Sequence, residues 1–412
     1  MSSIHTQLHD DIIAKEFIMQ FKNNTRFVTN VHQGHSKEFR KVGETIRVQK
    51  PNRFMTGSGS DITSSMNALK ESSVNLTLSQ EHCAIEFTAK DLTLGLDRFS
   101  ERIIQPVVDE LANKVDADGL AQYYKVYNAA GTAGTTPGTF AAIGDAATKL
   151  DNYGVPRKDR KLVLNPAAEW SIANALKGLY LEKEVRGMVT NGLLGRTGSF
   201  DIYGDQNVVS HTAGGNGGDP VVCLDSDISA GTTGLTYLTS DVNGSTSTVY
   251  LDGATASTEI FTQGDIITLG VYGVNPKNRN STGQLQQFTV ISGGTADSSG
   301  YLSLVVSPAI VTAAVNEAYQ TVVSAPAENA VPVLVGSHVA NLAFHKNAFT
   351  FATAQLEVLD GCKGSTATDD VTGISMRYMR QGNIYTDVNV MRFDILYAWQ
   401  CINPGFACRL LG

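Results

Sequence analysis

The composition of the chain changes in its middle, and this change constrains the fold more than any other feature. Residues 223–327 hold eight acidic and two basic side chains, Lys277 and Arg279, together with eleven glycines and many Ser and Thr. Runs typical of strands recur there, and turn signals such as Asn243-Gly244 separate them. The predicted strands are 235–238, 247–251, 265–274, 286–291 and 301–306. We expect an inserted all-β module, most simply a barrel, because α+β patterns resume after it.

A short amphipathic helix is predicted near the N-terminus. Its apolar positions share one face and are Leu8, Ile12, Ile13, Phe17 and Phe21. A helix with one apolar face and few apolar neighbours docks on something larger. The protein's own core is one candidate for that docking surface.

The clearest helix pattern covers residues 96–127. Its apolar stripe repeats at every fourth position and contains Phe99, Ile103, Val107, Leu111 and Val115. Pro106 removes one backbone donor inside this pattern and therefore predicts a kink or a helix start nearby. Asp116 and Asp118 resemble a fragment of a calcium loop, but the other ligands are missing, so we interpret them as part of an exposed helix turn.

A projecting hairpin is predicted between these two helices. Strand patterns at 42–48 and 74–78 flank the polar, Gly/Ser-rich segment 54–67. Such a hairpin has few apolar residues of its own to bury and needs a partner to hold it. The stretch 22–53 carries an excess of six positive charges. That charge is either a solvated face or a segment that meets an acidic partner, such as the acidic face of a neighbouring copy.

Helix and strand patterns alternate after the long helix. A helix is predicted around 143–150 and a buried strand at 161–165. Asn165 is a good N-cap and Pro166 a good first position for a further helix.

The part of the chain after the β module returns to mixed patterns. The segment 335–349 is compatible with a helix. Strands are expected at 374–378 and 391–399, with Arg392 and Asp394 on the outer face of the last one. Together with the earlier patterns, these elements predict an α+β fold class.

Charge and cysteine content limit the functional class. The net charge of −8 argues against a DNA binder held by a basic surface. No apolar run approaches the length of a membrane span, and the first residues lack a secretory signal pattern, so we expect a soluble protein made in the cytoplasm. The five cysteines form no Cys-x-x-Cys pair and are expected to be reduced, buried or partly buried thiols.

Signatures of catalysis are missing from the sequence. Walker-type, HExxH, GxSxG and strand-linked GxGxxG patterns do not occur, and the eight histidines show no metal-ligand spacing with carboxylates. We therefore expect no enzyme activity, no metal and no cofactor.

Several stretches, taken in order, carry a resemblance to a known family. They are LDRFSERIIQPVVDELANKVDADGLAQ (96–122), QGDIITLGVYGVNP (263–276), QQFTVI (286–291), LSLVVSPAI (302–310) and NLAFHKNAFTFA (341–352). They resemble the major capsid (coat) protein of tailed bacteriophages with the HK97-like fold, in particular the P22-type branch that carries an inserted domain. The first is similar to the spine-helix region, the next three to the insertion, and the last to the segment after it.

The resemblance implies how the chain is divided. The implied regions are an N-terminal arm (1–35), an E-loop hairpin with strands of the peripheral domain (36–90), the spine helix of that domain (91–130), the first part of the axial domain (131–222), an inserted β-barrel-like domain (223–327), the second part of the axial domain (328–371) and the C-terminal strands of the peripheral domain (372–412).

The resemblance also implies a function. Such coats self-assemble in the host bacterial cytoplasm into pentamers and hexamers of an icosahedral head, on a scaffolding protein and with a portal at one vertex. The shell then expands as double-stranded DNA is packaged. A decoration protein is a further candidate partner. The P22-type branch forms no covalent Lys–Asn crosslink, so none is expected in this virion capsid.

Two sets of contact residues are expected. The N-terminal arm would dock through Ile13, Phe17 and Phe21. Contacts between subunits would involve Arg47, Lys50 and Arg53 at the hairpin, and Arg98, Glu101 and Arg102 on the outer face of the long helix.

Other functions stay open at this stage. An encapsulin-like compartment shell would share the fold but load cargo enzymes and need no scaffold or portal. A carbohydrate-binding or decoration protein would be a stable monomer or trimer whose residues 223–327 bind glycan. An enzyme without a known motif would show a pocket of convergent titratable groups.

Overall fold

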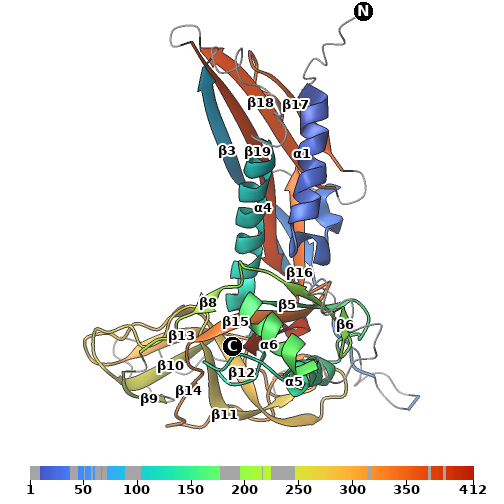
Figure 1. The fold of residues 1–412 in the computed structure, drawn as a ribbon. Helices are drawn as coiled ribbons and strands as arrows, with labels where there is room; N and C mark the ends of the chain where they lie inside the picture. The colour runs from blue at the N-terminus through green and yellow to red at the C-terminus, as the bar shows by residue number, and fades with distance from the viewer. Residues whose placement is uncertain are drawn as a thin grey trace, which may run out of the picture. The chain divides into compact units, whose positions relative to one another are not determined.

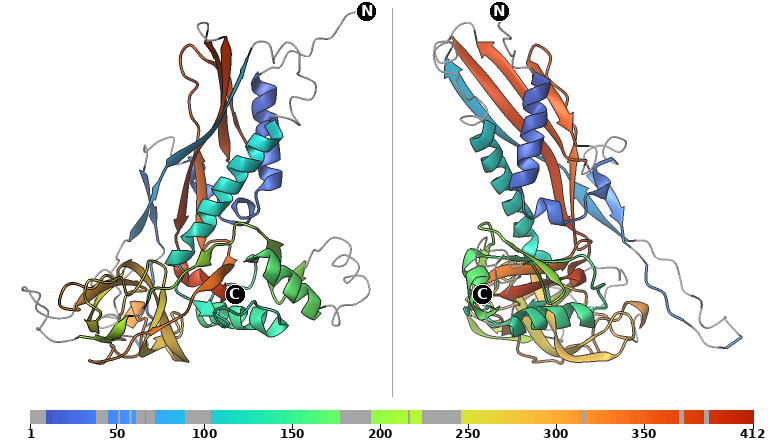
Figure 2. Two further views of the ribbon diagram at one scale, coloured as in Figure 1. Left: turned by 60° about the vertical axis from the view of Figure 1, so that its left-hand side comes forward. Right: turned by 45° about the vertical axis from the view of Figure 1, so that its right-hand side comes forward.

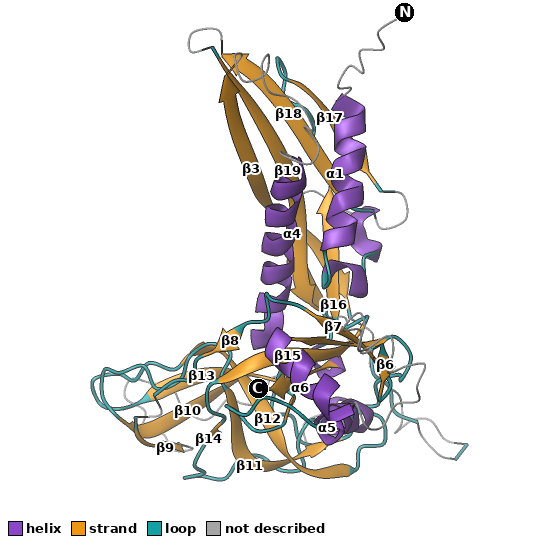
Figure 3. Ribbon diagram, in the orientation of Figure 1, coloured by secondary structure: helices purple, strands orange, loops and turns teal. Residues whose placement is uncertain are grey.

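The computed structural model (Figure 1) has the α+β composition that the sequence predicts, as the helices and strands in Figure 3 show. The residues that the structure describes are 10–37, 45–50, 52–56, 59–60, 66, 72–88, 104–176, 195–215, 217–223, 246–313, 317–369, 373–383 and 387–412. The chain divides into two compact units. The first unit comprises Met1–Val48, Val74–Gly119 and Phe349–Gln400, and the second unit comprises Gln49–Ser73, Leu120–Ala348 and Cys401–Gly412.

A five-stranded sheet forms the centre of the first unit. Its strands are β3 (Ser79–Thr88), β16 (Phe349–Ala354), β17 (Lys363–Thr368), β18 (Ser375–Asn383) and β19 (Val388–Cys401). The long β19 pairs antiparallel with β18 and with β3, and β17 extends the sheet beyond β18. The strands predicted at 374–378 and 391–399 are therefore present.

The strand β19 differs from the prediction in one respect, because both of its faces are covered. Asp394, expected on an exposed face, is 0% exposed. Its carboxylate accepts hydrogen bonds from the Arg377 guanidinium at 2.8 and 3.1 Å and from the Arg392 guanidinium at 2.7 Å. A buried carboxylate is tolerated only when it is paired in this way. Strict alternation of polar and apolar residues therefore misjudged this position.

The predicted N-terminal helix is α1 (Asp10–Asn24), and it packs on β17 and β18 of the same unit (Figure 2). Two 3-10 turns follow, η1 (Val28–Asn30) and η2 (Gly34–Lys37). The described part of the predicted long helix is α4 (Gln105–Leu120), followed by the 3-10 turn η4 (Ala121–Lys125). Residues 96–103 of the predicted helix lie outside the described residues, so the effect of Pro106 stays a prediction.

Asp116 of α4 is buried, which corrects the interpretation that it lies on an exposed turn. It is 3% exposed, and its carboxylate accepts backbone N–H groups of Arg26, Phe27 and Val28 at 2.6, 3.3 and 3.0 Å. These N–H groups lead into η1, whose first turn leaves donors without helical partners. One carboxylate on α4 therefore fixes the chain just after α1. Asp118, two residues further along α4, accepts a hydrogen bond from the Tyr397 hydroxyl at 2.5 Å.

The predicted hairpin is present as two short strands, β1 (Thr45–Gln49) and β2 (Ser73–Thr77), which pair with each other. Most of the segment between them lies outside the described residues. Ile46, Val48 and Leu76 are 4%, 7% and 0% exposed. The base of the hairpin therefore buries apolar side chains within the subunit, which the sequence did not predict.

A seven-stranded sheet forms the centre of the second unit. Its strands are β4 (Ala129–Ala130), β5 (Arg160–Leu164), β6 (Arg196–Thr197), β7 (Phe200–Gly204), β8 (Ser210–His211), β15 (His338–His345) and β20 (Ala407–Leu411). The helices α5 (Phe140–Asn152) and α6 (Pro166–Leu176) cover it, and α6 begins as predicted because Asn165 Oδ1 accepts the N–H of Ala168 at 3.0 Å. β20 pairs with β15, so the end of the chain belongs to this sheet rather than to the sheet of β18 and β19.

The segment 335–349 is not a helix. It contains β15, which lies between β20 and β5 and has seven of its eight residues buried. A strand covered on both faces carries apolar side chains almost continuously and loses the two-residue alternation. The sequence NLAFH at 341–345 therefore also matches a helical spacing, and tertiary burial decides between the two.

A six-stranded antiparallel sheet contains the predicted β module. Its order is β14-β11-β12-β13-β10-β9. The strands are β9 (Gly218–Val222), β10 (Ser247–Ala254), β11 (Ile266–Val274), β12 (Ser281–Gly293), β13 (Leu302–Ser307) and β14 (Val333–Leu334). Four of the five predicted strands are present, and 235–238 lies outside the described residues. The sheet also takes in β9 and β14, on either side of the predicted limits.

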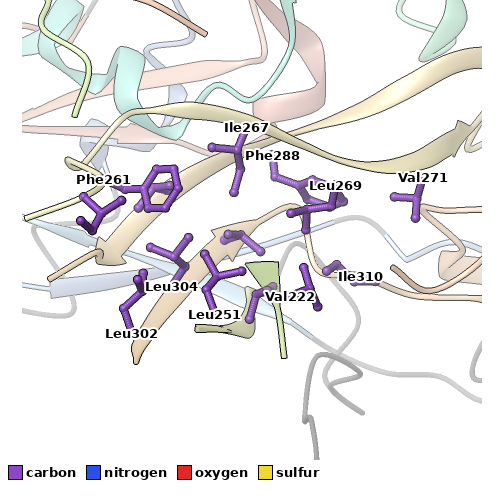
Figure 4. Packing of buried hydrophobic residues seen from close by; sticks show 14 of the residues in the cluster. Val222, Leu251, Phe261, Ile267, Leu269, Val271, Phe288, Leu302, Leu304 and Ile310 are labelled. Atoms are coloured by element: carbon purple, nitrogen blue, oxygen red, sulfur yellow. The ribbon is translucent and has the colours of Figure 1, made fainter. Parts of the chain in front are cut away.

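The apolar side of this sheet forms its own core (Figure 4). Phe261, Ile267, Phe288, Leu251 and Leu304 converge there and are each 0% exposed. The two edge strands come near each other through backbone hydrogen bonds from Val222 N to Ala330 O (2.9 Å) and from Asn329 N to Val222 O (2.8 Å). A closed barrel stays a prediction, since β9 and β14 do not themselves pair in the described ladder.

The first unit should lose stability when the Asp116 carboxylate is removed. We expect Asp116→Ala to lower the free energy of unfolding by about 3 kcal/mol, because three buried N–H groups lose their acceptor. Urea unfolding followed by the fluorescence of Trp399, whose indole N–H donates to Val115 O at 3.0 Å, measures the change. The exposed Asp360→Asn serves as control, and equal stability of both variants would contradict the role of Asp116.

Candidate functional site

The predicted contact residues lie in different parts of the structure. Arg47 is on β1 and exposed. Arg53 belongs to the second unit, where its backbone N–H donates to the hydroxyl of Tyr319 at 3.1 Å and its guanidinium carbon lies 5.9 Å from the centre of that ring. Lys50, also in the second unit, lines the same pocket as Arg53. The remaining three, Arg98, Glu101 and Arg102, lie outside the described residues.

The predicted docking residues of the N-terminal arm lie buried within the first unit. Ile13, Phe17 and Phe21 are 3%, 0% and 0% exposed. The ring of Phe17 is 5.0 Å from that of Phe393 on β19. At the end of α1, Lys22 Nζ lies 3.0 Å from the carboxylate of Asp369. The helix α1 is therefore fixed to its own subunit by apolar packing together with one partly exposed ion pair.

A buried polar cluster in the second unit was missed by sequence reasoning. His211 Nε2 lies 2.8 Å from Asp265 Oδ1, and its Nδ1 lies 3.0 Å from the hydroxyl of Tyr123. Because a carboxylate accepts, Nε2 donates to Asp265, while Nδ1 lies within hydrogen-bond distance of the Tyr123 hydroxyl. His211 and Asp265 are 54 residues apart in the chain, so no local spacing could have revealed the pair.

Backbone groups complete the environment of Asp265. The N–H groups of Thr262 and Gly214 donate to its Oδ2 at 2.7 and 3.1 Å. Position 214 has to be glycine for this approach, because a Cβ there would lie 2.3 Å from Ile260 O. The carboxylate is 0% exposed and fully hydrogen-bonded, so it joins the chain before β11 to β8 and to the loop after β8.

Arg409 of β20 is the second centre of this cluster. It is 0% exposed, and its guanidinium donates to Val126 O, Gly264 O and Thr289 Oγ1 at 2.8, 2.6 and 3.0 Å. Burial lowers the pKa of the guanidinium, and the field of Asp265 opposes that shift. Arg409 therefore ties the end of the chain to η4, to the turn before β11 and to β12. A lone charge in the apolar run FACRLLG was the one sequence signal that pointed to it.

His338 of β15 adjoins the same cluster. Its Nδ1–H donates to Gly336 O at 2.8 Å, and its ring centre lies 5.2 Å from that of His211. Its Nε2 is buried without a hydrogen-bond partner among the described residues. Burial lowers the pKa of His338 to about 4, and the charge of Arg409 acts in the same direction. The side chain is therefore neutral at pH 7.

The chemistry available to this cluster is structural. A tyrosine, a histidine and a carboxylate in a row resemble a relay, but His211 is 3% exposed and Asp265 0%, so a substrate cannot reach them. In the described part of the chain no three His, Cys, Asp or Glu side chains gather as a metal site, and no helix is both long and apolar enough to cross a membrane. The cysteines are free and either buried or partly buried, as predicted.

Comparison with known families gives a match over the full length of the chain. Residues 1–412 match the family model described as "P22 coat protein - gene protein 5". The chain therefore belongs to the P22 coat protein family. It is a major capsid protein that assembles with copies of itself into an icosahedral shell, and it is not an enzyme. A search of curated proteins found no match.

Three solved structures are similar to the chain at low identity. One from Mycobacterium phage Che8 is 10% identical, and 93% of this chain and 90% of that chain align with a TM-score of 0.44. The mature capsid of bacteriophage PhiM1 is 11% identical over 94% and 87%, with a TM-score of 0.42. A virus-like particle from Pyrococcus furiosus is 8% identical over 97% of both chains, with a TM-score of 0.38. The assignment rests on the family match.

The buried His338 predicts a pH dependence of stability. Its pKa in the folded chain, about 4, lies below the ordinary histidine value of 6.5, so the unfolded chain binds a proton first and stability falls as the pH drops below 6.5. We expect wild-type subunits to lose about 2 kcal/mol more than His338→Gln between pH 7 and pH 5. Urea unfolding of unassembled subunits at both pH values measures the difference, and identical losses would contradict a neutral buried His338.

Proposed function

We propose that this capsid protein forms the pentamers and hexamers of a tailed-phage head that encloses double-stranded DNA. Assembly takes place in the host bacterial cytoplasm on an internal scaffolding protein, with a portal at one vertex, and the shell expands as DNA enters. A decoration protein is a candidate for the outer surface. The observation that carries the proposal is the family match over residues 1–412.

In this proposal each region of the chain belongs to one domain of the capsid subunit. The arm (1–35), the hairpin region (36–90), the spine helix (91–130) and the strands β18 and β19 belong to the peripheral domain, and β16 and β17 join them because they lie in the same sheet. The rest of 131–222 and 328–371 forms the axial domain at the centre of each capsomer, together with β20, which pairs with β15. The insertion (223–327) stabilises the subunit, and the Arg409 and Asp265 contacts support this role because they join β11 and β12 to β8 and β20.

The charge of the chain supports packaging without tight DNA binding. The formal net charge is −8. Double-stranded DNA is retained on protein surfaces mainly by Lys and Arg contacts to its phosphates. A shell built from acidic copies therefore lets DNA be packed at high density without sequence-specific contacts.

Assembly itself uses many repeated interfaces between copies. The exposed Arg47 on β1, with Lys50 and Arg53 beyond it, contacts an acidic face of a neighbouring subunit. Arg98, Glu101 and Arg102 of the spine helix form further contacts between subunits. Charges at the rim of an interface set the encounter rate and register more than the affinity. The arm residues Ile13, Phe17 and Phe21 stabilise their own subunit and make no contact with a neighbouring copy, because they are buried within the subunit.

Expression with and without the neighbouring open reading frames tests the proposed function. Negative-stain electron microscopy should show closed shells of uniform size only when a scaffold-like neighbour is present. Closed shells that form without any neighbour and hold enzymes would instead identify a cargo compartment. Monomers or trimers under every condition, with glycan binding, would identify a binding protein and overturn the proposal.

The contact role of Arg47 predicts an assembly defect without a folding defect. We expect Arg47→Glu to reduce the assembled fraction by about tenfold, because a reversed charge meets a like charge across the interface. Circular dichroism of the unassembled subunit should be unchanged, since the side chain is exposed. Sedimentation separates shells from subunits, and Arg47→Lys, which keeps the charge, is the matched control. Normal shells from Arg47→Glu would remove Arg47 from the interface.

A further inference from the structure

The second unit contains a pocket whose described lining has two cations and no carboxylate. Lys50 and Arg53 form part of it, and residues from several segments between Tyr127 and Phe406 supply the rest, with a free volume of about 110 Å³. The chain has 40 Asp and Glu residues, so the absence of an acid from this lining is a local property. The pocket therefore presents positive charge to whatever enters it.

The position of Arg53 is fixed by the wall of the pocket. Its backbone N–H is held by the Tyr319 hydroxyl at 3.1 Å, and its guanidinium lies over the ring of that tyrosine. The residue that follows is also anchored, because Arg279 Nη2 donates to Phe54 O at 3.1 Å. Arg53 is exposed at the mouth of the pocket, where an arriving acceptor can reach it.

Of the two basic residues in the acidic segment 223–327, Lys277 lies beside this pocket and Arg279 bonds to the backbone next to Arg53. Lys277 packs over Gly154, where a Cβ would come within 2.7 Å of Lys277 Cδ. Arg279 has its Nε buried without a hydrogen-bond partner among the described residues. Pro276, which neighbours Lys277, lines the pocket itself.

The interior of the pocket adds neutral hydrogen-bonding groups. The Tyr153 hydroxyl donates to Gln286 Oε1 at 3.0 Å, and the rings of Tyr153 and Tyr127 are 5.7 Å apart. Burial raises the pKa of Tyr153 to about 12, so its hydroxyl carries no charge at neutral pH. The cations at the mouth are therefore not neutralised by the tyrosines behind them.

We propose that this pocket binds a carboxylate side chain of a second copy of this chain. The inference rests on the proposed function, in which identical copies meet in a shell. A guanidinium beside an apolar ring gains most from a carboxylate, because the two form short, charge-assisted hydrogen bonds in a partly desolvated place. Each copy has a net charge of −8, so acidic side chains are abundant on the neighbour. Arg53 is the donor, Tyr319 orients it, and Arg279 holds the backbone of the next residue, Phe54.

The first test removes the charge of Arg53. Full-length Arg53→Gln should fold normally, as circular dichroism and thermal unfolding report, but its critical concentration for assembly should rise about tenfold, the equivalent of one lost charged contact of about 1.4 kcal/mol. Arg196→Gln removes an exposed arginine of the same unit that does not line the pocket and should assemble as wild type. Assembly of Arg53→Gln at the wild-type critical concentration would overturn the proposal.

The second test asks for the anion directly. Glutarate added to unassembled wild-type subunits should bind in ligand-observed NMR, and it should inhibit assembly more strongly than sodium chloride at the same ionic strength. Both effects should be lost in Arg53→Gln and kept in Arg196→Gln. Equal effects of glutarate and chloride would overturn the proposal that this pocket binds a carboxylate. The NMR measurement uses unassembled subunits and does not depend on shells. A wild type that never assembles would therefore contradict the proposed function, while the NMR result would still test whether the pocket binds a carboxylate.

The third test identifies the source of the carboxylate. Phe54 is 57% exposed at the pocket mouth and can be replaced by the photoreactive p-benzoylphenylalanine. Shells are assembled from a mixture of isotopically light and heavy subunits, irradiated and digested. Mixed light–heavy crosslinks to a peptide with Asp or Glu would support a second copy. Crosslinks only to scaffold, or only within one copy, would overturn it.

Discussion

Three backbone amides of residues 26–28 point at one buried carboxylate, and the arrangement of the first unit depends on that contact. Asp116 lies on α4, about 90 residues further along the chain, and Trp399 and Tyr397 of β19 bond to the same helix. The amides after α1 could not be buried without an acceptor. Because the buried carboxylate also needs these donors, removing either partner leaves the other poorly compensated. The arm, the spine helix and the long strand are thereby joined into one body.

The second unit uses the same principle with the charge reversed. Arg409 donates to carbonyl or hydroxyl oxygens of three separate segments, and Asp265 collects donors from two others. The sheet of β10 to β13 has its own apolar core, but these polar contacts hold it against the sheet of β15 and β20. This arrangement suits a capsid subunit, because the body is already folded and only surface groups such as the exposed arginines need to contact neighbouring copies.

The sequence was sufficient to predict the elements whose signal comes from residues close together in the chain. The Asn165 cap, the long helix around α4 and the strand β11 follow from residues within a few positions of one another. It was insufficient at β15, because burial on both faces removes the alternation that marks a strand, and at Asp116 and Asp394, because their partners lie far away or on covered faces. The pairing of His211 with Asp265 and the reach of Arg409 over 283 residues to Val126 O are tertiary facts with no local trace. The family resemblance was carried by whole stretches rather than by any single site.

The central claim is that the subunit body is complete before assembly and that assembly adds only surface contacts. Hydrogen exchange with mass spectrometry on unassembled subunits tests it, read at the amides of Arg26, Phe27, Val28 and Arg409. The account predicts that these amides exchange roughly a thousandfold or more slowly than in an unstructured peptide, in subunits as in shells. Exchange at the rate of an unstructured peptide in subunits, with protection gained only in shells, would show that the buried joints form on assembly and would contradict the account.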